Sequence, residues 1–295
     1  MMRMNSYNSK RVNGFMDMET LRAYAPSVFT DSSAEHVSSK YQHISTREVV
    51  EGLIGQGFMP VMATQSRSRI EEKKAFTKHM IRFRHVDAAE TPEMGGLIPE
   101  LVLVNSHDGL SSYRLMAGIY RLVCSNGLVA GETFKEVRVR HQGNVIDNVI
   151  EGTFEVMSET QKMLEHAGNM SELILNREEK QLFAEAVHQI RFDGETVEET
   201  GIKPDQFLKA RRYQELHKDD LFTVFNIAQE NTIKGGLKGY AVDADGRYRN
   251  RTTGERLKKV TTREIKSIDQ NNNLNRALWT LAEKMAELKG MKLAA

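Results

Sequence analysis

Hydrophobic and polar positions alternate along the first half of the chain in a way that predicts three β-strands. Between residues 78 and 86, Met80, Arg82 and Arg84 alternate with apolar Ile81 and Phe83, which is the two-residue period of a strand. Residues 98–105 contain the apolar run LVLV, typical of a strand covered on both faces. Residues 58–66 form a similar segment before them. A polar and basic linker joins the first two segments, and a break with Pro92, Gly95 and Gly96 precedes the third, so the three predict an antiparallel β-β-β meander.

Helical spacing precedes and follows these strands. Ser45 stands before an apolar stripe, and Glu48 stands three positions after Ser45. This spacing is the sequence signature of a capped helix start. After the strands, apolar residues from Leu115 to Val123 recur at helical spacing. Residues 106–127 therefore predict a long helix that Asn-Gly ends. Arg114 and Arg121 would share one side of this helix.

Together these elements predict an α+β fold, in which a long helix crosses one face of an antiparallel β-β-β meander and a mostly helical C-terminal half follows. We expect a flexible N-terminal segment at residues 1–40, an α+β core with the β-β-β-α unit at 41–150, and a mainly helical region at 151–295. Helices are expected at 204–234 and 268–288. Between them, the Gly-rich and basic segment 235–260 predicts a mobile loop or a hairpin.

The composition is that of a globular, non-secreted protein. Hydrophobic residues make up 40% and charged residues 27% of the 295 positions, and no apolar run approaches the ~20 residues that a membrane-spanning helix needs. The first residues contain no continuous apolar stretch of the secretory-signal kind. The single cysteine, Cys124, cannot form an intramolecular disulfide, which fits a reducing compartment. We therefore expect a cytoplasmic protein with no membrane partner.

A formal net charge of +1 hides three segments of strong and opposite charge. Residues 67–85 carry seven Lys or Arg against two Glu, and residues 231–263 carry nine against three acidic residues. Between them, residues 151–200 carry twelve acidic residues against four basic ones. This arrangement predicts a bipolar surface suited to nucleic acid or to a protein partner. Ordinary solvated faces would give the same pattern, and that alternative stays open.

The basic segments supply the candidate nucleic-acid-binding residues. Arg82 and Arg84 must point to one face of their strand, where they would join basic residues of the adjoining connection in a strip suited to phosphates. Tyr41 and Tyr248 stand next to cations, which suits the stacking of unpaired bases. The full predicted set is Lys40, Tyr41, Arg67, Arg69, Lys73, Lys74, Arg82, Arg84, Arg114, Arg121, Lys234, Arg247, Tyr248, Arg249 and Arg251.

No sequence motif of a known catalytic or cofactor site occurs in the chain. Walker A, Rossmann, Cys-x-x-Cys, His-Glu-x-x-His and nucleophile-elbow patterns are all missing from the sequence. We therefore expect no catalytic residues, no metal and no cofactor. The string Asn-Ser-His-Asp-Gly at 105–109 would suit a metal or an acid–base pair built on His107 and Asp108. It is also a good turn and helix-cap sequence, and we favour that structural interpretation.

Three strings spread over most of the chain resemble an uncharacterised family. They are LVLVNSHDGLSSYRLMAGIYRLVCSNGLV, LFTVFNIAQENTIKGG and LNRALWTLAEKM, and the resemblance runs from about Tyr41 to Met285. Members of that family are known only as phage- or plasmid-like proteins with a domain of unknown function. The resemblance implies a mobile-element origin and assigns no catalytic residues.

The predicted order of elements carries a second and looser likeness. A helix, a β-β-β meander and a long helix across it are similar to the core of single-strand annealing proteins, the superfamily that includes phage recombinases. That likeness implies an oligomer, either a ring or a filament, with single-stranded DNA in an outer basic groove. It rests on the order of elements and not on motifs, and a shared fold does not prove a shared function.

Three functions remain open on the sequence. The first is a single-stranded DNA-binding and strand-annealing protein of a phage, plasmid or prophage, acting in recombination or repair as a homo-oligomer, with RNA open as a ligand. The second is an interaction protein with which a mobile element inhibits a host defence or replication factor, through the acidic 151–200 surface. The third is a metal-dependent nucleic-acid enzyme that uses His107 and Asp108.

Overall fold

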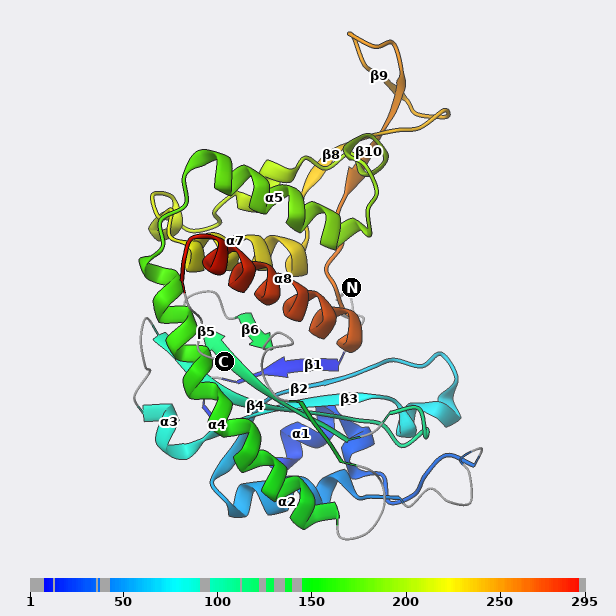
Figure 1. Ribbon diagram of the computed structural model, residues 1–295. Helices are drawn as coiled ribbons and strands as arrows, with labels where there is room; N and C mark the ends of the chain where they lie inside the picture. Colours follow the sequence, from blue (N-terminus) through cyan, green and yellow to red (C-terminus); the bar gives the residue numbers. More distant parts are fainter. Residues whose placement is uncertain are drawn as a thin grey trace. The chain divides into compact units, whose positions relative to one another are not determined.

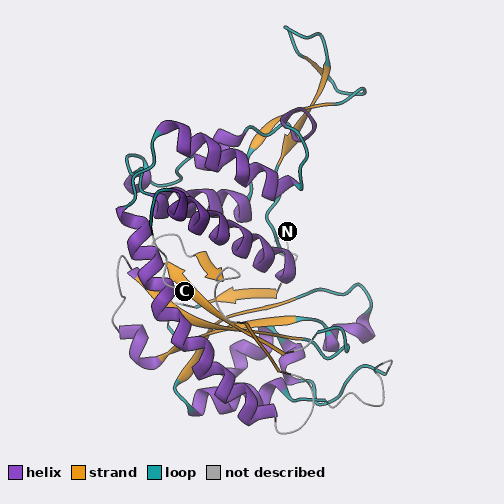
Figure 2. Cartoon of the chain, viewed as in Figure 1, coloured by secondary structure: helices purple, strands orange, loops and turns teal. Residues whose placement is uncertain are grey.

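The chain folds into two compact units, one made of residues 1–130 and 134–164 and the other of residues 131–133 and 165–295. The computed structural model describes residues 8–12, 14–35, 37, 43–90, 96–111, 113–121, 126–129, 136–139 and 145–291. The first unit holds a β-sheet with helices against it, and the second is mainly helical (Figures 1 and 2). The α+β class and the helical C-terminal half predicted from the sequence are therefore confirmed.

An antiparallel sheet forms the centre of the first unit. The three predicted strands are present and pair in sequence order, β2 with β3 and β3 with β4. β1 extends the sheet beside β2, β5 extends it beside β4, and β6 and β7 pair with opposite ends of β5. In the described residues the strands are β1 (Asn8–Arg11), β2 (Phe58–Gln65), β3 (His79–His85), β4 (Leu97–Asn105), β5 (Tyr113–Arg121), β6 (Asn126–Val129) and β7 (Glu136–Val139).

The segment predicted as a long helix is strand β5, so that prediction is wrong. Its register with β4 runs from Leu97 opposite Arg121 to Val104 opposite Arg114. Apolar residues are so dense here that they fit helical spacing and also the spacing of a strand buried on both faces. Pairing with β4 decides between the two. Because Arg114 and Arg121 lie seven positions apart on a strand, they point to opposite faces, and the shared basic side predicted for them does not exist.

Helices cover one face of this sheet (Figure 1). They are α1 (Met18–Tyr24), α2 (Thr46–Gly55) and the first part of α4 (Val145–Glu172). Ser45 Oγ accepts a hydrogen bond from the Glu48 backbone N–H at 3.3 Å, as the capping signature predicted. Phe154 on α4 meets Phe58 on β2 with 6.2 Å between ring centroids. The long helix across the sheet is thus α4, and short η1 (Pro26–Phe29), η2 (Glu71–Phe76) and α3 (Val86–Glu90) complete the unit.

The second unit packs three helices around a core that contains Trp279. They are α5 (Arg177–Phe192), α7 (Leu221–Lys234) and α8 (Ile268–Leu288), with one-turn α6 (Val197–Thr200). Every residue of α7 from Leu221 to Thr232 is buried, so this helix lies at the centre. Trp279 is fully buried and meets Phe225 edge to face. Among the described helices, none has the length and apolar character needed to cross a membrane.

Two helix boundaries in this unit differ from the sequence prediction. The Gly168-Asn169 pair predicts an interruption of the helical pattern, but α4 continues through both residues. The helix expected from residue 204 begins only at Leu221, where Asp220 Oδ1 accepts a hydrogen bond from the Thr223 backbone N–H at 2.8 Å. The residues before it form the 3-10 turns η4 (Pro204–Leu208) and η5 (Tyr213–Glu215). The signal for this later start was Asp220 standing directly before the apolar residues Leu221 and Phe222.

Of the two alternatives left open for residues 235–260, the hairpin is the one that forms. β8 (Lys238–Val242) and β9 (Tyr248–Arg249) both pair antiparallel with β10 (Arg256–Thr261). We call this three-stranded element, residues 238–261, the arm. In Figure 1 it projects from the helices of its own unit.

Candidate nucleic-acid interface

The basic strip predicted along the meander does not form, because its two strand arginines are buried in ion pairs. Arg82 Nε donates to Glu100 Oε2 at 2.5 Å, and Arg84 Nη2 donates to Glu100 Oε1 at 2.8 Å. The three side chains are only 4%, 10% and 0% exposed. Val102 is the register partner of Arg82, and Glu100, two positions away on β4, points to the same face. The prediction that Arg82 and Arg84 face solvent is therefore wrong.

Arg11 on β1 joins the same cluster from a third strand. Its Nη1 donates to Glu100 Oε1 at 2.9 Å. Burial alone would raise the pKa of Glu100, but the charges of Arg82, Arg11 and Arg84 outweigh it and hold that pKa at about 2. Alternation in the sequence marks two faces of a strand but not which of them is solvated. A single buried Glu on a neighbouring strand is the feature that sequence reasoning missed.

The other predicted residues of the first unit, and Lys234, are divided among separate elements. Arg67, Arg69, Lys73 and Lys74 are exposed in the connection between β2 and β3, where Lys74 pairs with Glu71. Arg114 and Arg121 are half-buried on opposite faces of β5. Lys234 ends α7 and donates to Glu230 at 2.6 Å. Lys40, Tyr41 and Cys124 lie outside the described residues.

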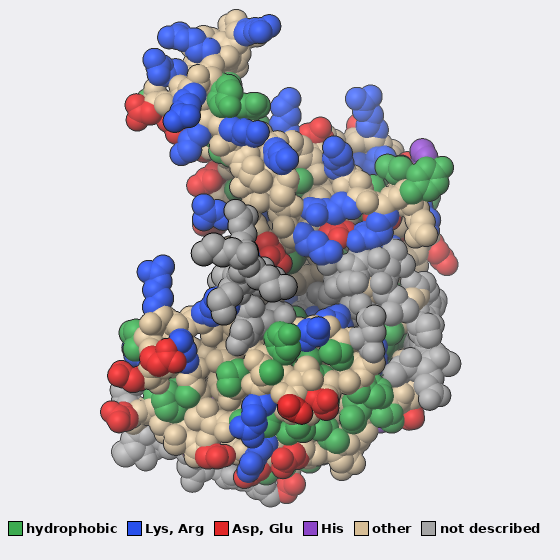
Figure 3. Space-filling model, turned by 180° about the vertical axis from the view of Figure 1, so that it is seen from behind, with side chains coloured by type: hydrophobic (Ala, Val, Ile, Leu, Met, Phe, Trp, Pro, Cys, Tyr) green, Lys and Arg blue, Asp and Glu red, His purple; other side chains and the backbone are tan. Residues whose placement is uncertain are grey.

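Four predicted residues come together on the arm. These are Arg247, Tyr248, Arg249 and Arg251, and all four are exposed. Arg256, Lys258 and Lys259 on β10 add to them, although the sequence prediction did not include these three. These three residues lie on β10, the strand that pairs with Tyr248 and Arg249. Predicting that pairing would have added them to the set. Figure 3 shows Lys and Arg side chains gathered along the arm.

Close backbone packing fixes the root of the arm. A Cβ on Gly239 would lie 1.7 Å from the carbonyl oxygen of Gly201, a distance that only glycine avoids. Gln206 Nε2 donates to the Lys238 carbonyl oxygen at 2.8 Å, which ties β8 to η4. The arm therefore leaves its unit from a defined position.

Strand register gives the arm two faces of different chemistry. Leu257 lies opposite both Val242 and Tyr248, and Lys259 lies opposite Tyr240. Because side chains alternate along a strand, these five share one face, which we call the tyrosine face. The opposite face carries Arg249 and Arg256, which are register partners, and Lys258. We call it the arginine face.

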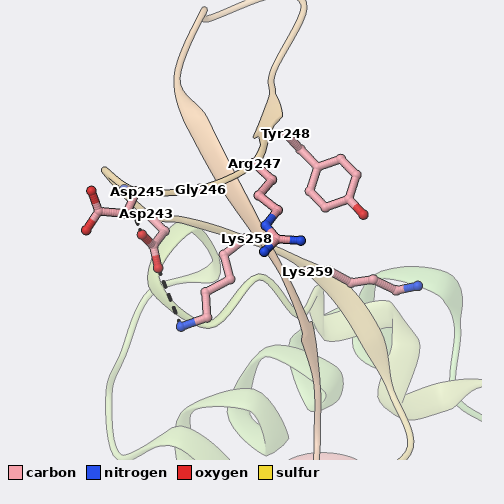
Figure 4. Close-up of a pocket in the computed structure, with 7 residues that line it drawn as sticks. All are labelled: Asp243, Asp245, Gly246, Arg247, Tyr248, Lys258 and Lys259. Atoms are coloured by element: carbon pink, nitrogen blue, oxygen red, sulfur yellow. Dashed lines mark hydrogen bonds and ion pairs between the residues drawn. The ribbon is translucent and has the colours of Figure 1, made fainter.

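A hollow of about 450 Å³ lies beside the arm. It is lined by Asp243, Asp245, Gly246, Arg247, Tyr248, Lys258 and Lys259. In Figure 4, Tyr248 and Lys259 extend to one side, and Lys258 extends to the other toward Asp243, which its Nζ meets at 3.5 Å. Within the described chain, Arg247, Arg249, Arg251, Arg256 and Lys259 form no ion pair. The arm thus presents cations that protein carboxylates do not neutralise.

The Asn-Ser-His-Asp-Gly string forms a structural turn. Asp108 Oδ1 accepts hydrogen bonds from Ser106 Oγ at 2.5 Å and from the Leu110 backbone N–H at 3.0 Å. His107 is fully buried, and its Nε2 lies 3.3 Å from Thr46 Oγ1. In the part of the chain that the structure describes, no three His, Cys, Asp or Glu residues form a group that could hold a metal ion. The geometry here favours the turn-forming role.

Thr46, the first residue of α2, is the centre of a buried polar cluster. His79 Nε2 lies 3.1 Å from its Oγ1, and Tyr113 Oη and Asn105 Nδ2 donate to that oxygen at 2.8 and 3.1 Å. His79 Nδ1 lies 2.8 Å from Ser27 Oγ. Burial lowers the pKa of His79 to about 4, against the weaker opposing effects of the Thr77 carbonyl and Asp108. His79 is therefore neutral at pH 7 and ties α2 and η1 to the sheet.

A sheet unit followed by a helical unit with a projecting basic arm defines a two-unit α+β protein. The chain belongs to the family described as Domain of unknown function (DUF932), whose model matches residues 34–279. Two proteins of Escherichia coli (strain K12), the UPF0380 proteins YfjQ and YafZ, are each 40% identical to it over 267 residues, which cover 90% of this chain and 89% of theirs. No solved structure matches. The resemblance to an uncharacterised family is confirmed, while the mobile-element origin and the annealing likeness stay predictions.

We expect Arg82→Ala to lower the free energy of unfolding by ~3–5 kcal/mol, because it removes one partner of a buried ion pair. Urea denaturation measures this directly. Arg69→Ala, which removes an exposed arginine from the same unit, is the control and should change stability by no more than ~0.5 kcal/mol. Equal stability of the two variants would contradict the buried cluster.

Stability should also fall as the pH drops from about 6.5 toward 4. The folded state holds the pKa of His79 at about 4, below its ordinary value of 6.5. As the pH falls, His79 therefore binds a proton in the unfolded chain before it does so in the folded protein. This contribution is fully present above pH 6.5 and decreases by up to ~3 kcal/mol as the pH falls through that window. Urea denaturation across the window measures it.

His79→Gln is the matching variant, because a neutral amide keeps hydrogen-bonding capacity and does not titrate. Its stability should be lower overall but flatter between pH 6.5 and about 4.5. The low pKa of Glu100 acts in a separate and more acidic window, below about 4.5. A wild-type protein whose stability is constant from pH 7 to 4.5 would rule out the neutral buried histidine.

Proposed function

We propose that the protein binds single-stranded nucleic acid, with single-stranded DNA as the expected ligand, and that the arm is its main contact. The observation that carries this proposal is the set of exposed arm cations with no ion-pair partner in the described chain. Residues 238–261 contain seven Lys or Arg against three Asp or Glu. An exposed, projecting and strongly cationic element suits a polyanion.

Contacts to phosphate explain why such an arm would bind without sequence preference. Each phosphate that a Lys or Arg neutralises releases a condensed counterion, so affinity falls as salt rises. Arg249 and Arg256 stand opposite one another in register on the arginine face. A strand laid along that face would meet both.

Strand annealing by an oligomer is the second part of the proposal. A protein that holds the backbone and leaves base edges accessible can bring complementary strands together. Support for this part comes from the order of elements alone. With β5 a strand, that order becomes a helix, four successive antiparallel strands and, later, α4 as the long helix across the sheet. Binding is therefore the step to test before annealing.

We expect Arg249→Ala with Arg256→Ala to weaken binding to labelled oligo-dT. The slope of log affinity against log salt should become shallower by about 1.4, since each lost phosphate contact on a single strand contributes about 0.7. Fluorescence anisotropy over a range of salt concentrations gives both values. Light scattering on the same samples gives the oligomeric mass.

Arg69→Ala with Lys73→Ala is the matched control, because it removes the same charge from the exposed connection of the first unit. It should bind much more like the wild type than the arm variant does. A wild-type protein that remains monomeric and does not bind oligo-dT would overturn the proposal and favour the alternative of a host protein partner.

A further inference from the structure

The tyrosine face of the arm carries two aromatic rings that lie close together and face solvent. Tyr240 on β8 and Tyr248 on β9 flank the central strand β10, and their ring centroids are 5.2 Å apart with the planes at 74°. Each residue is 48% exposed. The two rings therefore form an open aromatic corner on an element that projects from its unit.

Two cations lie beside this corner. Lys259 is the register partner of Tyr240 and shares its face. Arg247 precedes Tyr248, is exposed and lines the same hollow as Tyr248 and Lys259. Ring faces and positive charges are thus interleaved within one small surface. Val242, also on the tyrosine face, is 43% exposed and extends the apolar area.

This combination fits one kind of occupant. Bases of a single strand can leave the stack and lie against aromatic side chains, while the faces of bases inside a duplex are covered by their neighbours. A protein partner would also bury the rings. The surrounding cations, however, complement a chain of phosphates better than they complement an ordinary protein surface. Building on the proposed nucleic-acid binding, we propose that Tyr240 and Tyr248 form a stacking site for unpaired bases.

The hollow beside Tyr248 gives that site an orientation. Its volume of about 450 Å³ is in the range of small-ligand sites and can hold one nucleotide. Asp243 and Asp245 line one part of it and would repel a phosphate, whereas Arg247 and Lys259 line another. A nucleotide would therefore place its base against Tyr248 and its phosphate toward Arg247 and Lys259.

The test compares oligo-dT with an abasic oligonucleotide of the same length and charge. Stacking contributes only to the first, so the wild type should bind oligo-dT roughly ten-fold or more tightly than the abasic strand. Tyr240→Ala with Tyr248→Ala should remove this preference and leave binding to the abasic strand close to that of the wild type. Tyr240→Phe with Tyr248→Phe keeps both rings and should keep the preference.

Tyr213→Ala is the control, since this tyrosine of η5 is 82% exposed in the same unit but not on the arm. It should bind both oligonucleotides as the wild type does. Equal, salt-dependent binding of oligo-dT and abasic strand by the wild type would overturn the stacking site while leaving nucleic-acid binding intact. An alanine pair that weakens both ligands equally would also overturn it. If neither ligand binds, nucleic-acid binding itself fails.

Discussion

Glu100 is buried among Arg11, Arg82 and Arg84, and its ion pairs join three strands of the sheet in the first unit. A charge without compensation at such a buried position would cost several kcal/mol, so β1, β3 and β4 must keep their mutual register for the pairs to form. β1 contains four described residues, and its arginine gives it a specific attachment that backbone pairing alone would not. On the opposite face, Thr46 joins α2 to β3, β4 and β5 through side-chain hydrogen bonds. Polar contacts thus position the elements on both faces of an otherwise apolar sheet.

The sequence predicts much of this architecture where a local signal is strong. Ser45 and Glu48 marked the start of α2, and alternation around Ile81 and Phe83 marked β3. The terminal helix was predicted with the bounds that the structure has, Ile268–Leu288. β5 was missed because its residues are apolar on both faces, and a fully buried strand carries no period-two pattern. Only its partner β4 distinguishes strand from helix there.

Arginines show the same limit more sharply. Arg82 stands next to Phe83 and Arg249 stands next to Tyr248, each on a strand. Their neighbouring residues therefore give the same prediction for both. One is buried against Glu100 and the other is exposed on the arm. The difference depends on a carboxylate distant in sequence, which the neighbouring residues do not encode. Register also added Arg256, Lys258 and Lys259 to the candidate interface, because pairing brings residues from one strand beside those of another.

The packing of Gly239 against Gly201 bears on how strongly the arm could bind. A cationic loop without a fixed attachment would lose conformational entropy each time it gripped a ligand, and that loss would subtract from affinity. Here the direction of the arm and the register of its strands are set when the chain folds. The arm is preorganised, so most of its ordering cost falls on folding and little remains for association.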